Sequence, residues 1–275
     1  MKKKLYIHIG HPKTGTTSLQ EYFYENFYEK KDNLFYFPQK FTLEKSKEIH
    51  DANYDDPAVY KPPGLWAKGH HLLRWYQDSS DIYSGLLQEI NDNLSKNIIL
   101  SCESFHRSEF LTSDNFVNFV NDLRKNFDVF FVCYLQDPFT HESKIFYETR
   151  GRHMEDMVQA QREFQAFADE RLYAGGCWAN LYELPASNTI IRHYTPQINV
   201  IEDFLSIIGH PISPDFRRHN PSKKEITKFL VFRQDQIEEK RSVTLPQIQK
   251  LKDKFPSSQE QIQKLYESTI NFQQK

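Results

Sequence analysis

A short apolar strand that runs into a glycine-bounded loop constrains the fold of this chain more than any other feature. Residues 5–23 read LYIHIGHPKTGTTSLQEYF. The first residues are typical of a buried strand, Gly10 and Gly15 bound a turn, and an amphipathic segment begins at Thr16. Such a turn and the helix N-terminus after it bind anions, because their backbone N–H groups have no partner within the helix. The segment therefore predicts a phosphate-binding loop.

The lysine of this loop is displaced from the position that ATP and GTP enzymes use. Their loop reads G-x-x-x-x-G-K-[ST], with the lysine directly after the second glycine. Here Thr16 stands at that position and the lysine is Lys13. The hydroxyls of Thr14, Thr16, Thr17 and Ser18 add donors for an anion, but the clamp for a γ-phosphate is missing. The pattern therefore argues against a kinase.

Strands alternate with helices along the chain. Apolar segments typical of buried strands occupy Leu5–Gly10, Leu34–Pro38, Asn97–Ser101, Val129–Leu135 and Thr189–Tyr194. Helical patterns lie between them at 16–30, 81–95, 113–126 and after Asp137, with Ser113 and Asp137 as cap candidates. This alternation predicts an α/β fold, a parallel sheet with helices on both faces, whose ligands bind at the carboxyl ends of the strands.

We expect one domain over residues 1–275. Within it, residues 39–76 read as an irregular excursion or lid, because the segment contains DDPAVYKPPG. Residues 221–275 are polar with a helical pattern and predict a helical C-terminal extension.

Charge and cysteine content bound the function class. The net charge of −2 gives no overall electrostatic attraction to nucleic acid. Cys102, Cys133 and Cys177 share no metal-ligand spacing and are expected to be reduced, structural thiols. No segment has the length of a membrane span, and MKKKLYIHIG lacks the features of a signal peptide. We therefore expect a cytoplasmic protein without a transmembrane segment.

The sequence PKTGTTSLQ at residues 12–20 resembles the phosphosulfate-binding loop of sulfotransferases that use 3′-phosphoadenosine 5′-phosphosulfate (PAPS), written P-K-[ST]-G-T-T-x-L. IILSCESF, RHYTPQINVIEDFLSIIG and RRHNPSKKE are similar, more weakly, to other parts of bacterial sulfotransferase-like proteins. The resemblance implies a P-loop-containing nucleotide hydrolase-like fold. It also implies transfer of a sulfuryl group from PAPS to a hydroxyl of a carbohydrate, glycolipid or small metabolite, leaving 3′,5′-ADP.

This chemistry explains the displaced lysine. Sulfuryl transfer moves a singly charged group, so there is no γ-phosphate to clamp and no metal is expected. Charge grows instead on the bridging oxygen and the 5′-phosphate of the leaving nucleotide, where preorganised donors stabilise the transition state. By resemblance, Lys13 is the catalytic lysine. Thr14, Gly15, Thr16, Thr17 and Ser18 hold the 5′-phosphosulfate together with it.

The attacking hydroxyl needs a base, which in this family is a His or Glu. Glu103 follows the strand predicted at 97–101 and is the first candidate; its alternative is an exposed carboxylate or a partner of Arg107. His11 in the loop is a rival, as is the pair His70-His71. Adjacent histidines without further ligands at suitable spacing are weak evidence for a metal. His8 alternates with apolar residues and is expected to be a core histidine.

The resembled family holds the 3′-phosphate of PAPS with an Arg at a strand end and a Ser eight residues later. In YLQDPFTHESKIFYETR, Gln136 replaces that Arg, and Lys144 stands eight residues on with Ser143 before it. Gln136, Ser143 and Lys144 are therefore the candidates for this phosphate, and further charge comes from Arg150, Arg152, Arg217 or Arg218. The replacement opens an alternative, in which the same fold binds another 3′-phosphonucleotide such as coenzyme A or binds without catalysis.

The acceptor is expected to be a small molecule or a glycan or lipid-linked group. Its candidate ligands in the 39–76 segment are His70, His71 and Arg74, beside Trp66 and Trp75. These aromatic side chains are equally expected to pack a loop onto the sheet. The sequence leaves the oligomeric state open.

Overall fold

The structure is a computed structural model that describes residues 2–52, 69–70, 72–73, 78–102, 105, 108–150, 154, 156–172, 179–212 and 230–272. The chain divides into two compact units, which are taken in turn. The first comprises residues 1–10, 15–132 and 199–219, and the second comprises residues 11–14, 133–198 and 220–275. The expectation of one domain over the whole chain stays a prediction.

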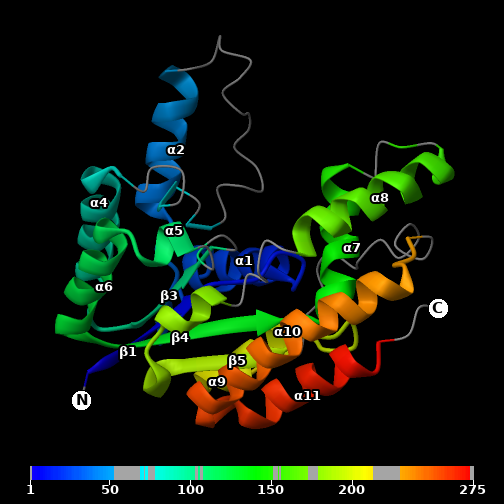
Figure 1. The fold of residues 1–275 in the computed structure, drawn as a ribbon. Coiled ribbons are helices and arrows are strands. Elements are labelled where there is room, and N and C mark those ends of the chain that lie inside the picture. The colour runs from blue at the N-terminus through cyan, green and yellow to red at the C-terminus, as the bar shows by residue number, and fades with distance from the viewer. Residues whose placement is uncertain are drawn as a thin grey trace. The chain divides into compact units, whose positions relative to one another are not determined.

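A five-stranded sheet forms in the order β2-β3-β1-β4-β5, and Figure 1 labels β1, β3, β4 and β5. Its strands are β1 (Lys3–His8), β2 (Phe35–Tyr36), β3 (Asn97–Ser101), β4 (Phe127–Leu135) and β5 (Thr189–His193). β1 pairs in parallel with both β3 and β4, and β2 pairs in parallel with β3. Leu5–His8 and Ile98–Ser101 are buried throughout, so both faces of the central strands are covered. The predicted α/β fold, a parallel sheet flanked by helices, is confirmed.

The helices of the first unit are α1 (Thr16–Phe23), α2 (Lys40–Ala52), α4 (Ser80–Asn91), α5 (Ser108–Leu111), α6 (Asp114–Asn126) and α9 (Val200–Ile208). α1 continues into a π-helical segment, Tyr24–Glu29, so the helix predicted over 16–30 is present as far as Glu29. α6 begins where predicted, because Ser113 Oγ accepts a hydrogen bond from the N–H of Phe116.

The prediction of an irregular segment over residues 39–76 is wrong for residues 40–52, because Lys40–Ala52 forms helix α2. Its first N–H groups are capped by a distant carboxylate. Lys40 N donates to Glu89 Oε1 at 3.0 Å and Phe41 N donates to Glu89 Oε2 at 2.8 Å. No cap residue near position 40 signals a helix start, because the cap comes from α4. Residues 53–68 lie outside the described part.

The helices of the second unit are α7 (Pro138–Thr149), α8 (Met157–Leu172), α10 (Gln234–Lys254) and α11 (Gln259–Ile270), with short 3-10 turns at Ala179–Glu183, Ala186–Asn188 and Pro256–Ser258. α7 starts as predicted, because Asp137 Oδ1 accepts from Thr140 N at 2.9 Å and Pro138 stands at the first helical position. α10 and α11 pack side by side (Figure 1) and form the C-terminal helices that were expected.

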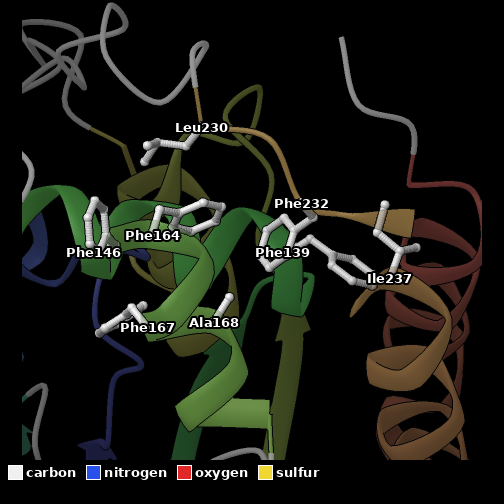
Figure 2. Close-up of a cluster of buried hydrophobic side chains, with 8 residues drawn as sticks. All are labelled: Phe139, Phe146, Phe164, Phe167, Ala168, Leu230, Phe232 and Ile237. Atoms are coloured by element: carbon white, nitrogen blue, oxygen red, sulfur yellow. The ribbon is translucent and has the colours of Figure 1, made fainter. Parts of the chain in front are cut away.

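A phenylalanine-rich core fixes α7 in the second unit. Figure 2 shows side chains from α7, α8, the segment before α10 and α10 itself that pack together: Phe139, Phe146, Phe164, Phe167, Ala168, Leu230, Phe232 and Ile237. Phe139 and Phe146 are fully buried there. α7 is therefore held to this core by its phenylalanine side chains, while other positions of the same helix carry polar residues. None of the helices in the described residues is long and apolar enough to span a membrane.

Candidate functional site

The loop between β1 and α1 holds three residues with positive φ. Gly10 has a φ of 41°, Lys13 of 67° and Gly15 of 87°. Glycine adopts this conformation without strain, but a lysine in it costs about 1–3 kcal/mol and is found mostly at sites that bind ligands or react. The loop therefore keeps Lys13 in an unfavourable backbone conformation, as expected where the lysine serves a function rather than the fold.

Gly15 precedes α1 and has a second reason to be glycine. A Cβ atom added there would lie 2.7 Å from Val200 Cγ1 on α9. Real Cβ atoms do not approach side chains this closely, so any larger residue must displace Val200 or the loop. The backbone at the start of α1 is thus set by both its dihedral angles and close packing.

The hydroxyl of Thr16, at the first position of α1, is a buried polar group without a hydrogen-bond partner in the described residues. Thr16 is 3% exposed. Buried hydroxyls are almost always paired in folded proteins, and the exceptions are frequently ligand sites. Helix N-termini also present unpaired N–H groups and a favourable dipole to anions. The residues present therefore fit a bound phosphate or sulfate oxygen at this point.

Thr14 differs from Thr16, because its hydroxyl donates to the His11 carbonyl oxygen at 2.6 Å. That bond closes the turn from within, so Thr14 shapes the loop through this hydroxyl. Ser18 is buried on α1 and Thr17 is partly exposed. The binding roles predicted for these residues stay predictions.

His8 and Ser101 lie opposite each other in the register of β1 and β3 and are joined by a hydrogen bond of 2.9 Å between Nδ1 and Oγ. Gln20 of α1 donates to the Ser101 carbonyl oxygen at 3.1 Å. Burial lowers the pKa of His8 to about 3, so the imidazole is neutral at physiological pH. His8 is the core histidine that its place in the strand predicts.

His70, predicted as a ligand of the acceptor, is buried and bonded through both ring nitrogens. Ser101 N donates to His70 Nδ1 at 3.0 Å, so the proton must be on Nε2, which lies 2.8 Å from the Pro38 carbonyl oxygen. These contacts tie residue 70 to the end of β3. His70 thus has a structural role in the first unit, and its contact with an acceptor stays a prediction.

Several other predicted site residues lie outside the described part. Glu103, the candidate base, and His71 and Arg74, candidate acceptor ligands, are among them, as are Arg152, Arg217 and Arg218. The chain that leads to Glu103 is described as far as Cys102, whose N–H donates to the His8 carbonyl oxygen at 3.1 Å. Cys102 and Cys133 are buried and are not joined in a disulfide, as expected, and Cys177 lies outside the described residues.

In the second unit, the loop segment 11–14 lies against α7. The rings of His11 and His141 are 4.0 Å apart between centroids, and both residues are buried. Beside them, Lys240 of α10 forms an ion pair of 3.2 Å with Glu142, and the two side chains are 5% and 6% exposed. Sequence reasoning missed this pair, because no pattern links residues 98 positions apart.

Gln136 and Lys144, which the family resemblance makes candidates for the 3′-phosphate, are in contact. Lys144 Nζ donates to Gln136 Oε1 at 3.1 Å and lies 5.4 Å from the centre of the Tyr194 ring. Burial lowers the pKa of Lys144 to about 8; the charge of Asp137 opposes this shift and that of Lys13 adds to it. Ser143 is buried beside them. Arg150, another candidate, instead stacks over Phe167 at 5.4 Å.

The described residues contain no group of three or more His, Cys, Asp or Glu side chains that could hold a metal ion. The loop carries a strained lysine and the buried Thr16 hydroxyl, and the second unit carries the Lys144–Gln136 pair. Each of these side chains can donate a hydrogen bond to an anion.

Comparison with known proteins found no matching family model and no matching curated protein. A sulfotransferase from Alicyclobacillus acidocaldarius is similar in structure, with 14% identity and a TM-score of 0.44, over 92% of this chain and 96% of that one. The sulfotransferase domain of the Synechococcus PCC 7002 olefin synthase has 12% identity and a TM-score of 0.38, over 89% of this chain and 96% of that one. Likeness at this level does not establish a family or an activity.

Proposed function

We propose that the chain is a sulfotransferase that uses PAPS and transfers its sulfuryl group, by in-line displacement, to a hydroxyl of a carbohydrate, glycolipid or small metabolite. One observation carries the proposal: the PKTGTT loop keeps Lys13 in a strained backbone conformation beside a helix start. The buried Thr16 hydroxyl, unpaired in the described residues, supports it, because an oxyanion would supply the partner.

When bound, PAPS supplies a sulfuryl group already activated by attachment to a phosphate. In the proposal, Lys13 stabilises the charge that grows on the leaving 5′-phosphate. The N–H groups at the start of α1 and the side chains of Thr16, Thr17 and Ser18 hold the phosphosulfate, while Gly15 allows the backbone to come close to it. Neither role needs a metal ion.

Glu103 accepts the proton of the attacking hydroxyl, and His11 is the alternative base. The sequence supports the assignment: Glu103 comes two residues after Ser101, where β3 ends, and ligands of parallel sheets bind at the carboxyl ends of the strands. His11 is enclosed against His141, which makes it the poorer candidate for direct contact with an acceptor.

Gln136 favours a second candidate function. A neutral amide where the resembled family carries an Arg weakens the case for PAPS as the donor and admits another 3′-phosphonucleotide, such as coenzyme A, or binding without catalysis. A cytoplasmic location and a small-molecule, glycan or lipid-linked acceptor belong to the leading proposal.

Calorimetric titration with 3′,5′-ADP, coenzyme A and ATP-Mg separates these functions. The proposal expects 3′,5′-ADP to bind, and Lys13→Ala to weaken it about 10- to 100-fold, the equivalent of one charged hydrogen bond of roughly 1.5–3 kcal/mol. Lys125→Ala is the matched control, because this exposed lysine pairs only with Asp122 on its own helix among the described contacts. Absence of 3′,5′-ADP binding, or equal binding by Lys13→Ala, would contradict the proposal.

The base is tested separately with Glu103→Gln. This variant keeps the shape of the side chain and should retain 3′,5′-ADP affinity while sulfuryl transfer from PAPS is lost. Unchanged turnover would remove Glu103 as the base without affecting the assignment of the loop.

A further inference from the structure

The second unit holds a lysine that is poorly placed for the fold alone. Lys144 lies in the middle of α7, largely withdrawn from water, between the Gln136 amide and the Tyr194 ring. Among the described residues it forms no ion pair, and its polar contact is to the neutral amide oxygen of Gln136. A lysine withdrawn from water normally has a carboxylate partner, because desolvating an unpaired charge is costly. The carboxylate whose charge acts on it, Asp137, is bonded to Thr140 N as the cap of α7, so Lys144 can still accept an anion as a partner.

The contact with Gln136 orients the glutamine as well. A lysine ammonium can only donate, so the amide oxygen must face Lys144 and the amide NH₂ must face elsewhere. The pair thus offers one ammonium and one amide NH₂ group, all of them donors. Such a set suits a phosphate, whose oxygens only accept.

The phosphate loop lies close to this pair within the second unit. His141 contacts His11 of the loop at 4.0 Å between ring centroids, and Lys144 follows His141 by about one turn of α7. The charge of Lys13, in the same loop segment, reaches Lys144. Two cations from separate segments therefore converge on one region beside α7.

We propose that Lys144, oriented by Gln136, supplies the positive charge of the 3′-phosphate site, and that nucleotide recognition consequently weakens as the pH rises above neutral. The inference rests on the proposed function and adds to it a pH-dependent preference for ligands that carry a 3′-phosphate. An arginine in the same role would stay charged at any physiological pH, whereas a partly buried lysine can lose its proton.

The groups around Lys144 set the direction of this dependence. Burial is the largest effect and brings the pKa of Lys144 down to about 8; Lys13 adds to the shift and Asp137 opposes it. Asp137 is engaged as the cap of α7 through Thr140, and Tyr194 presents its ring face. With a pKa of about 8, Lys144 is about nine-tenths charged at pH 7 and about one-tenth charged at pH 9. A phosphomonoester is already doubly charged over this range, since its second pKa is about 6.

The experiment measures the affinities of 3′,5′-ADP and 5′-AMP by calorimetry at pH 7 and pH 9. The ratio of the two affinities isolates the 3′-phosphate, because the remainder of the ligand is common. For the unmodified chain we expect the ratio to fall about tenfold between pH 7 and pH 9, in step with the charge on Lys144. Lys144→Gln should lower the ratio at pH 7 to near its pH 9 value.

Two further variants separate charge from structure. Lys144→Arg should keep a high ratio at both pH values, because guanidinium does not lose its proton. The double variant Gln136→Arg, Lys144→Gln moves the charge to the other member of the contact pair and should also abolish the pH dependence. Circular dichroism and thermal melting of each variant identify any that fail to fold, and the unmodified chain provides the pH test without substitution.

A ratio that is the same at both pH values in the unmodified chain, or unchanged in folded Lys144→Gln, would overturn the inference while leaving the proposed function intact. If neither nucleotide binds at either pH, the proposed function itself fails. The two failures are thus distinguishable.

Discussion

Replacing Gly15 by alanine tests whether the start of α1 is as tightly specified as its geometry indicates. The substitution adds a single methyl group at a residue whose φ is +87°. Two separate penalties are expected. One is the backbone strain of an L-residue in the left-handed region, and the other is the overlap of the new Cβ with Val200 Cγ1 at 2.7 Å.

The magnitude follows from these two terms. Left-handed backbone costs a non-glycine residue about 1–2 kcal/mol, and overpacking of a buried contact typically adds about 1–3 kcal/mol. Gly15→Ala should therefore lower the free energy of unfolding by about 2–5 kcal/mol. Gly209 provides the matched control in the same unit: its φ is +71°, but an added Cβ would meet nothing within 4 Å. Gly209→Ala should incur only the backbone term.

The assay is urea unfolding of four variants: Gly15→Ala, Gly209→Ala, Val200→Ala and the double variant Gly15→Ala, Val200→Ala. In the Val200→Ala background the overlapping methyl groups are gone, so Gly15→Ala should cost only about 1–2 kcal/mol there. If Gly15→Ala costs the same in both backgrounds, or no more than Gly209→Ala, the packing argument is refuted. Amide hydrogen exchange in α1 shows whether any loss is local to that helix.

Two other predictions concern the first unit. Glu89→Gln should destabilise the start of α2. The Glu89 carboxylate accepts hydrogen bonds from Lys40 N, Phe41 N and the Tyr36 hydroxyl, and an amide has only one acceptor oxygen. We expect faster amide hydrogen exchange at the start of α2 and little change in α6, which serves as the reference. Stability should also fall as pH falls from about 6.5 towards the His8 pKa of about 3, because the unfolded chain binds a proton there that the folded chain excludes. The slope contributed by His8 is at most about 1.4 kcal/mol per pH unit and should vanish in His8→Phe, if that variant folds; an unchanged slope in the folded variant would contradict the burial argument.

The strands and the loop could be predicted from the sequence because their determinants are local. Continuous apolar segments such as Asn97–Ser101 are buried on both faces of a parallel sheet, and the structure places a strand on that same range. Ser113 and Asp137 cap the helices that they were expected to cap, because the capping hydrogen bond spans only three residues.

The features that could not be predicted depend on distant partners. The start of α2 is capped by Glu89, and the buried charge of Glu142 is matched by Lys240. In each case one residue alone reads as an ordinary surface charge, since Glu and Lys are mostly exposed. Only the folded chain brings the partners together, and a single sequence carries no periodic signal for such pairs.

The Gln136–Lys144 contact is intermediate between the locally determined features and those that depend on distant partners. The two residues are eight apart, and they meet because β4 ends at Leu135 and α7 begins at Pro138 with its side chains folded back towards that strand end. In the sequence, the glutamine at position 136 means that the positive charge of an arginine is missing there. In the structure, Lys144 contacts Gln136 and brings a positive charge to the same place, and burial lowers the pKa of this lysine. The glutamine at position 136 is therefore only a weak argument against recognition of a 3′-phosphate. If Lys144 supplies the charge, the preference for a 3′-phosphate depends on pH; if no residue supplies it, that pH dependence is absent.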